Sequence, residues 1–144
     1  AGASMTMLMN EKTMEKYNLK PLAKIVAFGW AAVDPSIMGE GPVPASKKAL
    51  RYAGLNIEDI DYWEINEAFA VVVLNAVKNL NIDLDKVNIH GGAIAIGHPL
   101  GASGARITGT LARILKEKNA KYGLATLCVG GGQGFSVILE NVNK

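Results

Sequence analysis

The stretch LATLCVGGGQGFSVIL, residues 124–139, contains two apolar runs separated by a glycine-rich loop. The runs 124–129 and 135–139 have the length and composition of strands. Only GGGQG separates them, whereas a parallel pair needs a crossover of a dozen or more residues. The sequence therefore predicts two neighbouring antiparallel strands joined by this loop.

Upstream of the hairpin, strand and helix patterns alternate. We expect strands at 24–33 and 61–65, and mixed strand character with a Gly-Gly break at 87–96. We expect a short helix capped by Asn10 that ends near Asn18, and longer helices at 45–53, 67–80 and 101–118. Pro44 suits a first helical turn and Gly54 a helix end. This alternation favours a mostly parallel sheet covered by helices.

Composition excludes several classes of protein. The chain has 144 residues, of which 49% are hydrophobic and 19% charged, so it can form one domain with a sizeable core. The net charge is +2 with the two signs interspersed, so no nucleic acid or membrane partner is expected. A single Cys excludes a disulfide framework and a Cys-built zinc site, and we expect no metal. The longest uncharged stretch, 87–105, contains Pro and Gly and does not suit a membrane span, and no signal-peptide pattern is present. We expect a cytoplasmic α/β domain.

Glycine and chemically reactive residues concentrate in one part of the chain. Eleven of the 16 glycines lie between Gly91 and Gly134, together with His98 and Cys128. Pro99 disfavours helical backbone at His98, which places this histidine in a loop before a helix. There it could accept a proton from a thiol or hydroxyl and stabilise an oxyanion. The alternative is a histidine satisfied by local backbone groups.

Cys128 ends a predicted strand, which is the usual place for functional groups in an open α/β sheet. The glycines that follow, beginning with Gly130, could present backbone N–H groups to an oxyanion. The thiol could act as a base or a nucleophile, or it could be buried and inert. No Lys-Ser/Thr pair follows the glycines, so a P-loop is not indicated.

Four further polar or aromatic positions each have a structural interpretation. Asn66 either caps the following helix or holds a water or substrate oxygen at the end of a strand. Glu67 suits the first turn of that helix. His90 is more consistent with an exposed or structural histidine than with a catalytic one, and Trp63 with packing.

Three motifs together resemble those of the thiolases: NEAF at 66–69, GGAIAIGHPLGASGAR at 91–106 and CVGGGQG at 128–134, in the same order and spacing. Residues 34–45 also resemble the thiolase segment that precedes them. The resemblance extends over essentially the whole chain and implies the C-terminal half of an acetyl-CoA acetyltransferase. It implies an α/β fold of βαβαβαββ topology, with a five-stranded mixed sheet covered by helices and residues 1–144 as one domain.

The resemblance also implies roles for individual residues. His98 would activate a nucleophilic cysteine and help to bind the thioester oxygen, and Asn66 would hold a water in the same oxyanion hole. Cys128 would transfer a proton, and the Gly130 N–H would bind the other oxyanion.

Three further residues, Met38, Ala68 and Phe69, would line the pantetheine and acyl pocket. The implied reaction is the Claisen condensation of two acetyl-CoA to acetoacetyl-CoA and its reversal by thiolysis, with coenzyme A thioesters as substrates and no other cofactor.

By the same resemblance, we expect the nucleophilic cysteine, which belongs to the N-terminal half of a thiolase, and the loop domain that binds coenzyme A to lie outside residues 1–144. We therefore expect the chain to be a fragment or one subunit of a split enzyme, inactive alone, that pairs with the N-terminal half in a homo-oligomer. Alternatives are a 3-ketoacyl-CoA thiolase of broader chain length and a non-catalytic assembly subunit. Intact Asn66, His98 and Cys128 argue against the second.

Overall fold

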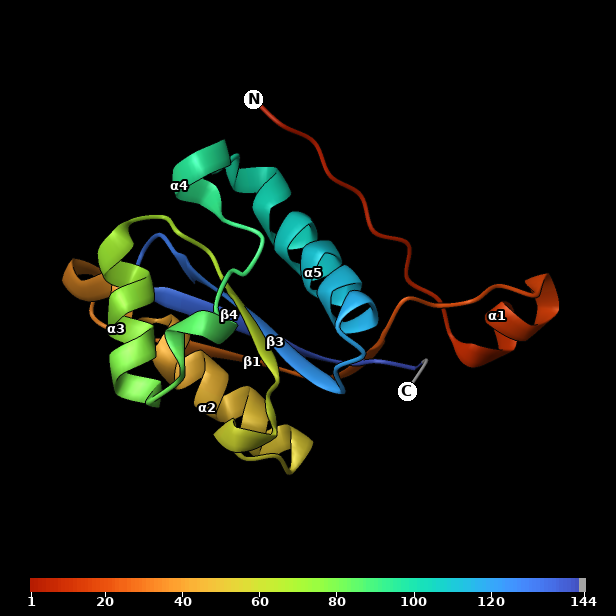
Figure 1. Cartoon of the computed structure of the whole chain (residues 1–144). Coiled ribbons are helices and arrows are strands. Elements are labelled where there is room, and N and C mark those ends of the chain that lie inside the picture. The colour runs from red at the N-terminus through yellow and green to blue at the C-terminus, as the bar shows by residue number, and fades with distance from the viewer. Residues whose placement is uncertain (143–144) are drawn as a thin grey trace.

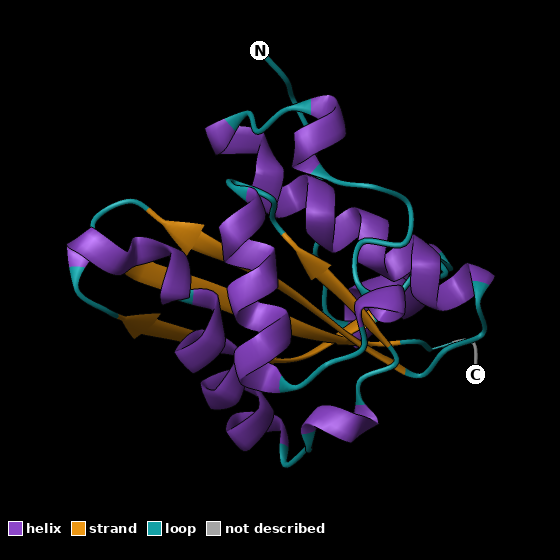
Figure 2. Ribbon diagram, turned by 60° about the vertical axis from the view of Figure 1, so that its left-hand side comes forward, coloured by secondary structure: helices purple, strands orange, loops and turns teal. Residues whose placement is uncertain are grey.

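The computed structural model describes residues 1–142 as a sheet with helices on both faces (Figures 1 and 2). The helices are α1 (Glu11–Tyr17), α2 (Pro42–Ala53), α3 (Ala70–Leu80), α4 (Ala93–Ile96) and α5 (Leu100–Glu117). The strands are β1 (Lys24–Ala32), β2 (Tyr62–Ile65), β3 (Tyr122–Val129) and β4 (Gln133–Glu140). Three short 3₁₀ turns are η1 (Pro35–Glu40), η2 (Ile57–Asp59) and η3 (Leu84–Lys86). None of these helices is long and apolar enough to cross a membrane.

The sheet has the strand order β1-β4-β3-β2. The predicted hairpin is confirmed, because β3 and β4 pair antiparallel with Leu124 opposite Ile138. β4 also pairs antiparallel with β1, and only β2 and β3 are parallel. The expectation of a mostly parallel sheet is therefore wrong. The hairpin places β4 between β3 and β1, and β4 runs opposite to both neighbours.

The expected fifth strand, within 87–96, does not form among the described residues. Only Val87 pairs with Trp63, in a single parallel bridge. The next residue, Asn88, has a left-handed φ of 49° that turns the chain away from the sheet. Its side-chain amide takes the place of a strand partner, since Oδ1 accepts from the Ile65 N–H and Nδ2 donates to the Ile65 C=O, both at 2.8 Å. The α/β class and the mixed sheet are as expected, with four strands in place of five.

Helix ends follow the predicted signals at most positions. The Asn10 side chain accepts from the Thr13 N–H at the start of α1, and Asn18 ends the helix in a left-handed conformation. α2 begins at Pro42, three residues before the predicted start, and ends at Gly54 with a φ of 68°. α5 agrees with its prediction to within one residue at each end.

The core lies in two layers, one on each face of the sheet. Trp63 is buried between the sheet and helices α2 and α3, which confirms its expected packing role. Leu111 and Leu115 of α5 pack against Ala125 and Leu139 on the opposite face. Successive strand residues point to opposite faces, so each strand contributes to both layers.

The tip of the β3–β4 hairpin packs against the junction of η1 and α2. The Val33 N–H donates to the Gly132 C=O at 2.7 Å. The backbone of Gly134 lies so close to that of Gly41 that a Cβ added to Gly134 would collide with the Gly41 carbonyl. Glycine is therefore required at this contact, and the contact holds the glycine loop after Cys128 against the start of α2.

We expect Gly134→Ala to lower the free energy of unfolding by about 2–4 kcal/mol, because backbone atoms cannot move aside as a flexible side chain can. Gly109→Ala is the matched control. A Cβ at Gly109, in the middle of α5, would meet no atom within 4 Å, so this change should stabilise the helix by about 0.5–1 kcal/mol. Urea unfolding measures both effects, and equal stability of the two variants would contradict the proposed contact.

Candidate active site

Two of the predicted site residues lie at the same edge of the sheet. Asn66 directly follows β2, and its backbone N–H donates to the Thr126 C=O of β3 at 2.9 Å. Cys128 lies two residues beyond Thr126 on β3. Because β2 and β3 are parallel, their carboxyl ends meet at one edge, which is where open α/β sheets place their ligands.

The structure brings His98 to Asn66. His98 lies in the loop between α4 and α5, and the Asn66 Nδ2 is 3.4 Å from its Nε2 and 3.5 Å from its Nδ1. The Asn66 side chain is 1% exposed, and its Oδ1 has no hydrogen-bond partner among the described residues. This buried amide therefore contacts the imidazole and retains a free acceptor.

The Asn66 side chain does not cap a helix, so that interpretation is wrong. α3 begins at Ala70 rather than at Glu67, with Phe69 in the cap position. The side chains of Asn66 and Glu67 instead contact the segment 88–98. These contacts keep the backbone between β2 and α3 outside the helix.

Ser103 determines which nitrogen of His98 can act as a base. Its Oγ lies 2.6 Å from the His98 Nδ1 and 3.1 Å from the Pro99 C=O. The Pro99 carbonyl can only accept, so the serine hydroxyl donates to it and presents a lone pair to the imidazole. His98 Nδ1 then carries the proton, which leaves Nε2 as a proton acceptor.

Sequence reasoning missed Ser103 and Arg106 as parts of this site, although both lie within the glycine-rich motif. Arg106 reaches back from α5 and donates from Nη1 to the Gly97 C=O at 2.7 Å. A signal was present, because Ser103 and Arg106, five and eight residues after His98, fall in the first two turns of the helix that follows Pro99. Periodicity alone could not show which side chains turn back toward the loop.

Cys128 is buried, with 6% of its surface exposed. Burial raises the pKa of its thiol, and its own backbone N–H acts in the opposite direction. The resting group at neutral pH is therefore the thiol, which can donate a proton. Gly130 lies at the exposed tip of the hairpin, with open space where a side chain would be.

The predicted pocket residues Met38, Ala68 and Phe69 surround the start of α3. Met38 is half-buried in η1, which packs against α3. Ala68 is half-buried, and its N–H donates to the Asn66 C=O at 2.9 Å. Phe69 is 61% exposed. The structure thus gathers the three residues on the α3 side of the site.

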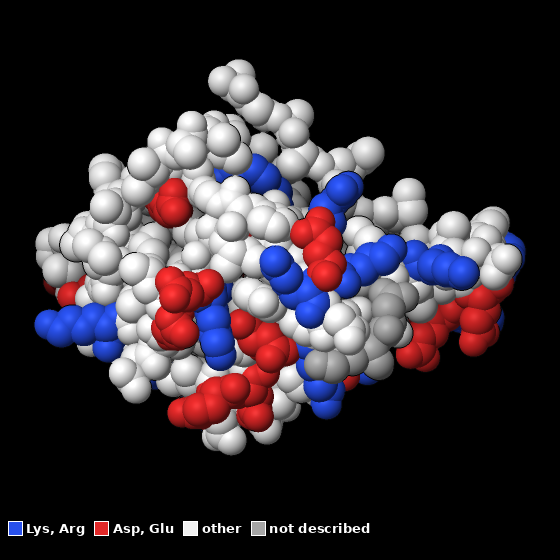
Figure 3. Space-filling model, viewed as in Figure 1, with Lys and Arg blue, Asp and Glu red and all other residues white. Residues whose placement is uncertain are grey.

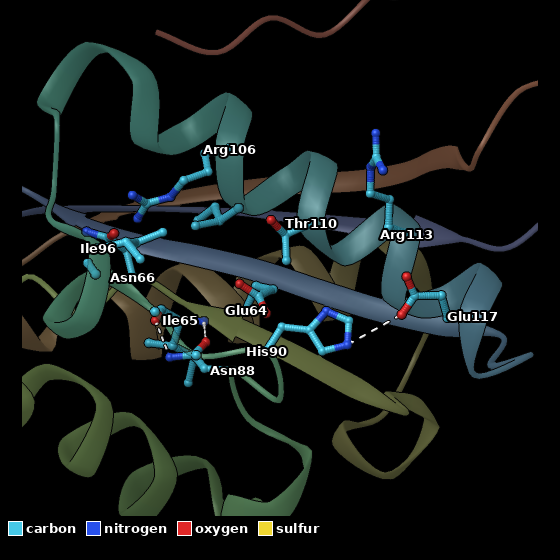
Figure 4. Close-up of a pocket in the computed structure, with 14 residues that line it drawn as sticks. Glu64, Ile65, Asn66, Asn88, His90, Ile96, Arg106, Thr110, Arg113 and Glu117 are labelled. Carbon is cyan, nitrogen blue, oxygen red and sulfur yellow. Dashed lines mark hydrogen bonds and ion pairs between the residues drawn. The ribbon is translucent and has the colours of Figure 1, made fainter. Parts of the chain in front are cut away.

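A cavity of about 250 Å³ lies beside the site, between β2, the segment that follows Asn88 and α5. Figure 4 shows Arg106 and Thr110 of α5 on one side of it and Glu64 on the other, with His90 and Glu117 near one end. His90 is exposed, as expected, and its Nε2 lies 3.4 Å from the Glu117 carboxylate. Across residues 1–142, no group of three or more His, Cys, Asp and Glu side chains could hold a metal ion.

Glu64 is the unusual group in this cavity. It is 3% exposed, and its Oε1 has no hydrogen-bond partner within the described chain. Burial raises the pKa of Glu64 to about 8; the negative charge of Glu67 adds to this shift and the guanidinium of Arg106 opposes it. Glu64 is therefore mostly neutral at pH 7.

Residues 19–141 match the model of the thiolase C-terminal domain. This chain belongs to the thiolase family. It is 52% identical over 144 residues to a 3-ketoacyl-CoA thiolase of Marinobacter nauticus, covering 98% of this chain and 37% of that protein. It is 51% identical over 141 residues to an acetyl-CoA acetyltransferase of Allochromatium vinosum, covering 98% of this chain and 36% of that protein.

The fold is also that of a solved thiolase. A crystal structure of human mitochondrial 3-ketoacyl-CoA thiolase in complex with CoA superimposes with a TM-score of 0.89 and 48% sequence identity, covering 92% of this chain and 34% of that one. The chain thus spans about a third of the length of the thiolases that it matches. The resemblance inferred from the three motifs is confirmed.

The neutral state of Glu64 makes stability depend on pH. An unfolded glutamate loses its proton near pH 4.5, whereas folded Glu64 keeps it up to about pH 8. Between these values the folded state binds more protons, so the free energy of unfolding falls as pH rises. Glutamine is neutral at every pH, so the free energy of unfolding of Glu64→Gln should not fall in this way. We expect it to rise relative to that of the wild type by a few kcal/mol between pH 5 and pH 8.

Urea unfolding at several pH values measures this difference. The control is Glu58→Gln, at an exposed glutamate in η2, which measures the effect of the same substitution away from the cavity. A constant difference for Glu64→Gln would show that the carboxylate is ionised in the folded protein.

Proposed function

We propose that this thiolase domain acts in acyl transfer between coenzyme A thioesters, as the C-terminal half of an acetyl-CoA acetyltransferase. The observation that carries the proposal is the contact of Asn66 with His98, whose Nδ1 faces Ser103, at the sheet edge that also holds Cys128. This arrangement combines an amide, an imidazole whose Nε2 carries no proton, and a thiol. Those groups serve both acylation of a cysteine and proton transfer at carbon.

In the proposed mechanism, His98 Nε2 takes the proton of a nucleophilic cysteine supplied by the N-terminal half. That sulfur attacks the thioester carbonyl, the coenzyme A sulfur leaves, and the histidine returns the proton to it. Asn66 assists by holding a water that donates to the thioester oxygen. Ser103 supports this role because it keeps the proton on Nδ1.

In the second half of the reaction, the Cys128 thiol first passes its proton to the freed His98 Nε2, and the resulting thiolate removes a proton from the α-carbon of a second acetyl-CoA. The carbanion attacks the acylated cysteine, the cysteine sulfur leaves as a thiolate, and His98 returns the proton to it. In the thiolysis direction the Cys128 thiol returns the proton to the departing carbanion, and its raised pKa suits this acid role. The Gly130 N–H is proposed to bind the oxyanion of this step.

The proposed substrates are acetyl-CoA and acetoacetyl-CoA, with no further cofactor. A 3-ketoacyl-CoA of longer chain is the second candidate, because relatives of both names match with nearly equal identity. Phe69 and Met38 are the residues on this chain proposed to contact the acyl and pantetheine groups. We propose a cytoplasmic setting on the basis of the single cysteine and the interspersed charges.

The proposed partner is the N-terminal thiolase half, in an enzyme that forms a homo-oligomer. One face of β1 and β4 exposes a stack of aromatic rings, with Phe28 and Trp30 each 51% exposed and Phe135 43% exposed. Exposed Ile94 and Ile96 of α4 flank the His98 loop, and few charges lie over α4 in Figure 3. Apolar surfaces of this kind mark interfaces, and the thiolases that this chain matches are about three times as long.

Cys128→Ser in the full-length enzyme should reduce turnover about 10²–10⁴-fold in both directions, because the pKa of a hydroxyl is far above that of a thiol and its deprotonated form is scarcely available as a base at pH 7. Acylation of the nucleophilic cysteine should largely survive, since His98 rather than Cys128 activates it. Mass spectrometry of the trapped acyl-enzyme, measured alongside turnover, separates the two steps. Loss of acylation as complete as the loss of turnover would show that the roles of Cys128 and His98 are wrongly assigned.

Phe28→Asp should lower the thermal stability of the full-length protein, because it places a charge in the proposed interface. In the 144-residue chain alone the same change should have little effect, since Phe28 is half-exposed there. Leu84→Asp is the control, as Leu84 is 55% exposed on η3 near the other edge of the sheet. Equal effects of Phe28→Asp in the two proteins would contradict the proposed interface.

A further inference from the structure

We propose that Glu67 is a positioning residue that sets the place of the His98 imidazole by holding helix α4. The inference rests on the proposed function, because it concerns the geometry of the base in that reaction. Glu67 itself contacts no group to which a reacting atom has been assigned. Its effect on the chemistry passes through the backbone of the segment 92–98.

The Glu67 carboxylate joins two segments that are otherwise separate. One oxygen, Oε1, accepts from the Asn88 Nδ2 at 3.0 Å, and the other, Oε2, accepts from the Ile94 N–H at 2.9 Å. Asn88 is bound in turn to both backbone groups of Ile65 at the end of β2. The carboxylate therefore links the edge of the sheet to the first turn of α4.

The Glu67 carboxylate packs closely against the backbone of the segment that it binds. It lies directly against Gly92, where an added Cβ would collide with the Glu67 carboxyl group. The Gly92 backbone thus lies on one side of the carboxylate, and the Ile94 N–H and the Asn88 amide donate hydrogen bonds to it. Hydrogen bonds to an ionised acceptor are the stronger kind, so these contacts fix the start of α4.

Only a short rigid path separates α4 from His98. The Gly97 N–H donates to the Ala93 C=O at 2.7 Å, which closes the single turn of α4. The Gly97 C=O is held by Arg106, and the next residue is His98. A displacement at Ile94 therefore moves the backbone that carries the imidazole.

Asn66 and Glu67 act on the same loop from adjacent positions. Asn66 contacts the imidazole of His98, and Glu67 holds the start of the helix that precedes it. The dipeptide thus sets both the imidazole and its backbone relative to β2. In keeping with these contacts, α3 begins at Ala70, three residues after Glu67.

Glu67→Gln in the full-length enzyme tests the proposal. The glutamine oxygen can replace only one of the two acceptors, and the amide nitrogen then faces a donor, either Asn88 Nδ2 or Ile94 N–H. We expect kcat to fall about 10–100-fold, because small displacements of a catalytic group have effects of this size. KM for acetoacetyl-CoA should change less than about twofold, as Glu67 contacts no predicted substrate group.

A second readout isolates His98 from overall stability. The rate at which iodoacetamide alkylates the nucleophilic cysteine at pH 7 reports its thiolate fraction, which His98 controls in the proposed mechanism. This rate should fall in parallel with kcat in Glu67→Gln, while the melting temperature changes little. Glu67→Asp, which retains both acceptors on a shorter side chain, should recover part of both rates, and Glu58→Gln should leave them unchanged.

The outcomes separate the two proposals. An unchanged kcat and alkylation rate in Glu67→Gln, with an active wild type, would overturn the positioning role. A loss of activity that follows a loss of melting temperature, with no change in alkylation of the folded fraction, would overturn it in favour of a purely structural role. A wild-type enzyme without thiolysis or condensation activity would overturn the proposed function instead.

Discussion

The parallel pairing of β2 with β3 is the constraint on which the arrangement of the site depends. β2 has only four residues, and the hydrogen bond from the Asn66 N–H to the Thr126 C=O continues the pairing by one more. That bond places Asn66 at the same edge of the sheet as Cys128. A slip of one residue would turn the Asn66 side chain to the opposite face and away from His98.

The second structural feature of consequence is the replacement of a strand by a side chain. Asn88 satisfies both backbone groups of Ile65, so the free edge of β2 needs no further partner there. The chain can then leave the sheet, form the single turn of α4 and return with His98. A continued fifth strand would carry these residues along the sheet instead of over its end.

The site buries two side-chain oxygens whose hydrogen-bonding capacity is not used within the described chain. Asn66 and Glu64 each bury an oxygen without a hydrogen-bond partner in the described chain, whereas the clusters around Trp63 and Leu111 are apolar. Burial of such groups opposes folding. Polar groups buried in this way near one sheet edge are typical of functional sites, where residues needed for the chemistry lower the stability of the folded protein.

Local sequence determined the hairpin and the helix ends at Asn10, Asn18 and Gly54, because short-range sterics and hydrogen bonding decide turns and caps. The family followed from three sequence motifs taken together. The sequence also singled out Asn66, His98 and Cys128. Tertiary structure decided that β4 lies between β1 and β3 and that the segment after Val87 is not a strand. It also decided between the two interpretations of Asn66, whose side chain contacts an imidazole rather than a helix end. These outcomes depend on partners far apart in the chain, such as Asn88 for Ile65 and Ser103 for the ring of His98. Neither propensity nor periodicity carries information about which distant group will satisfy a given donor or acceptor.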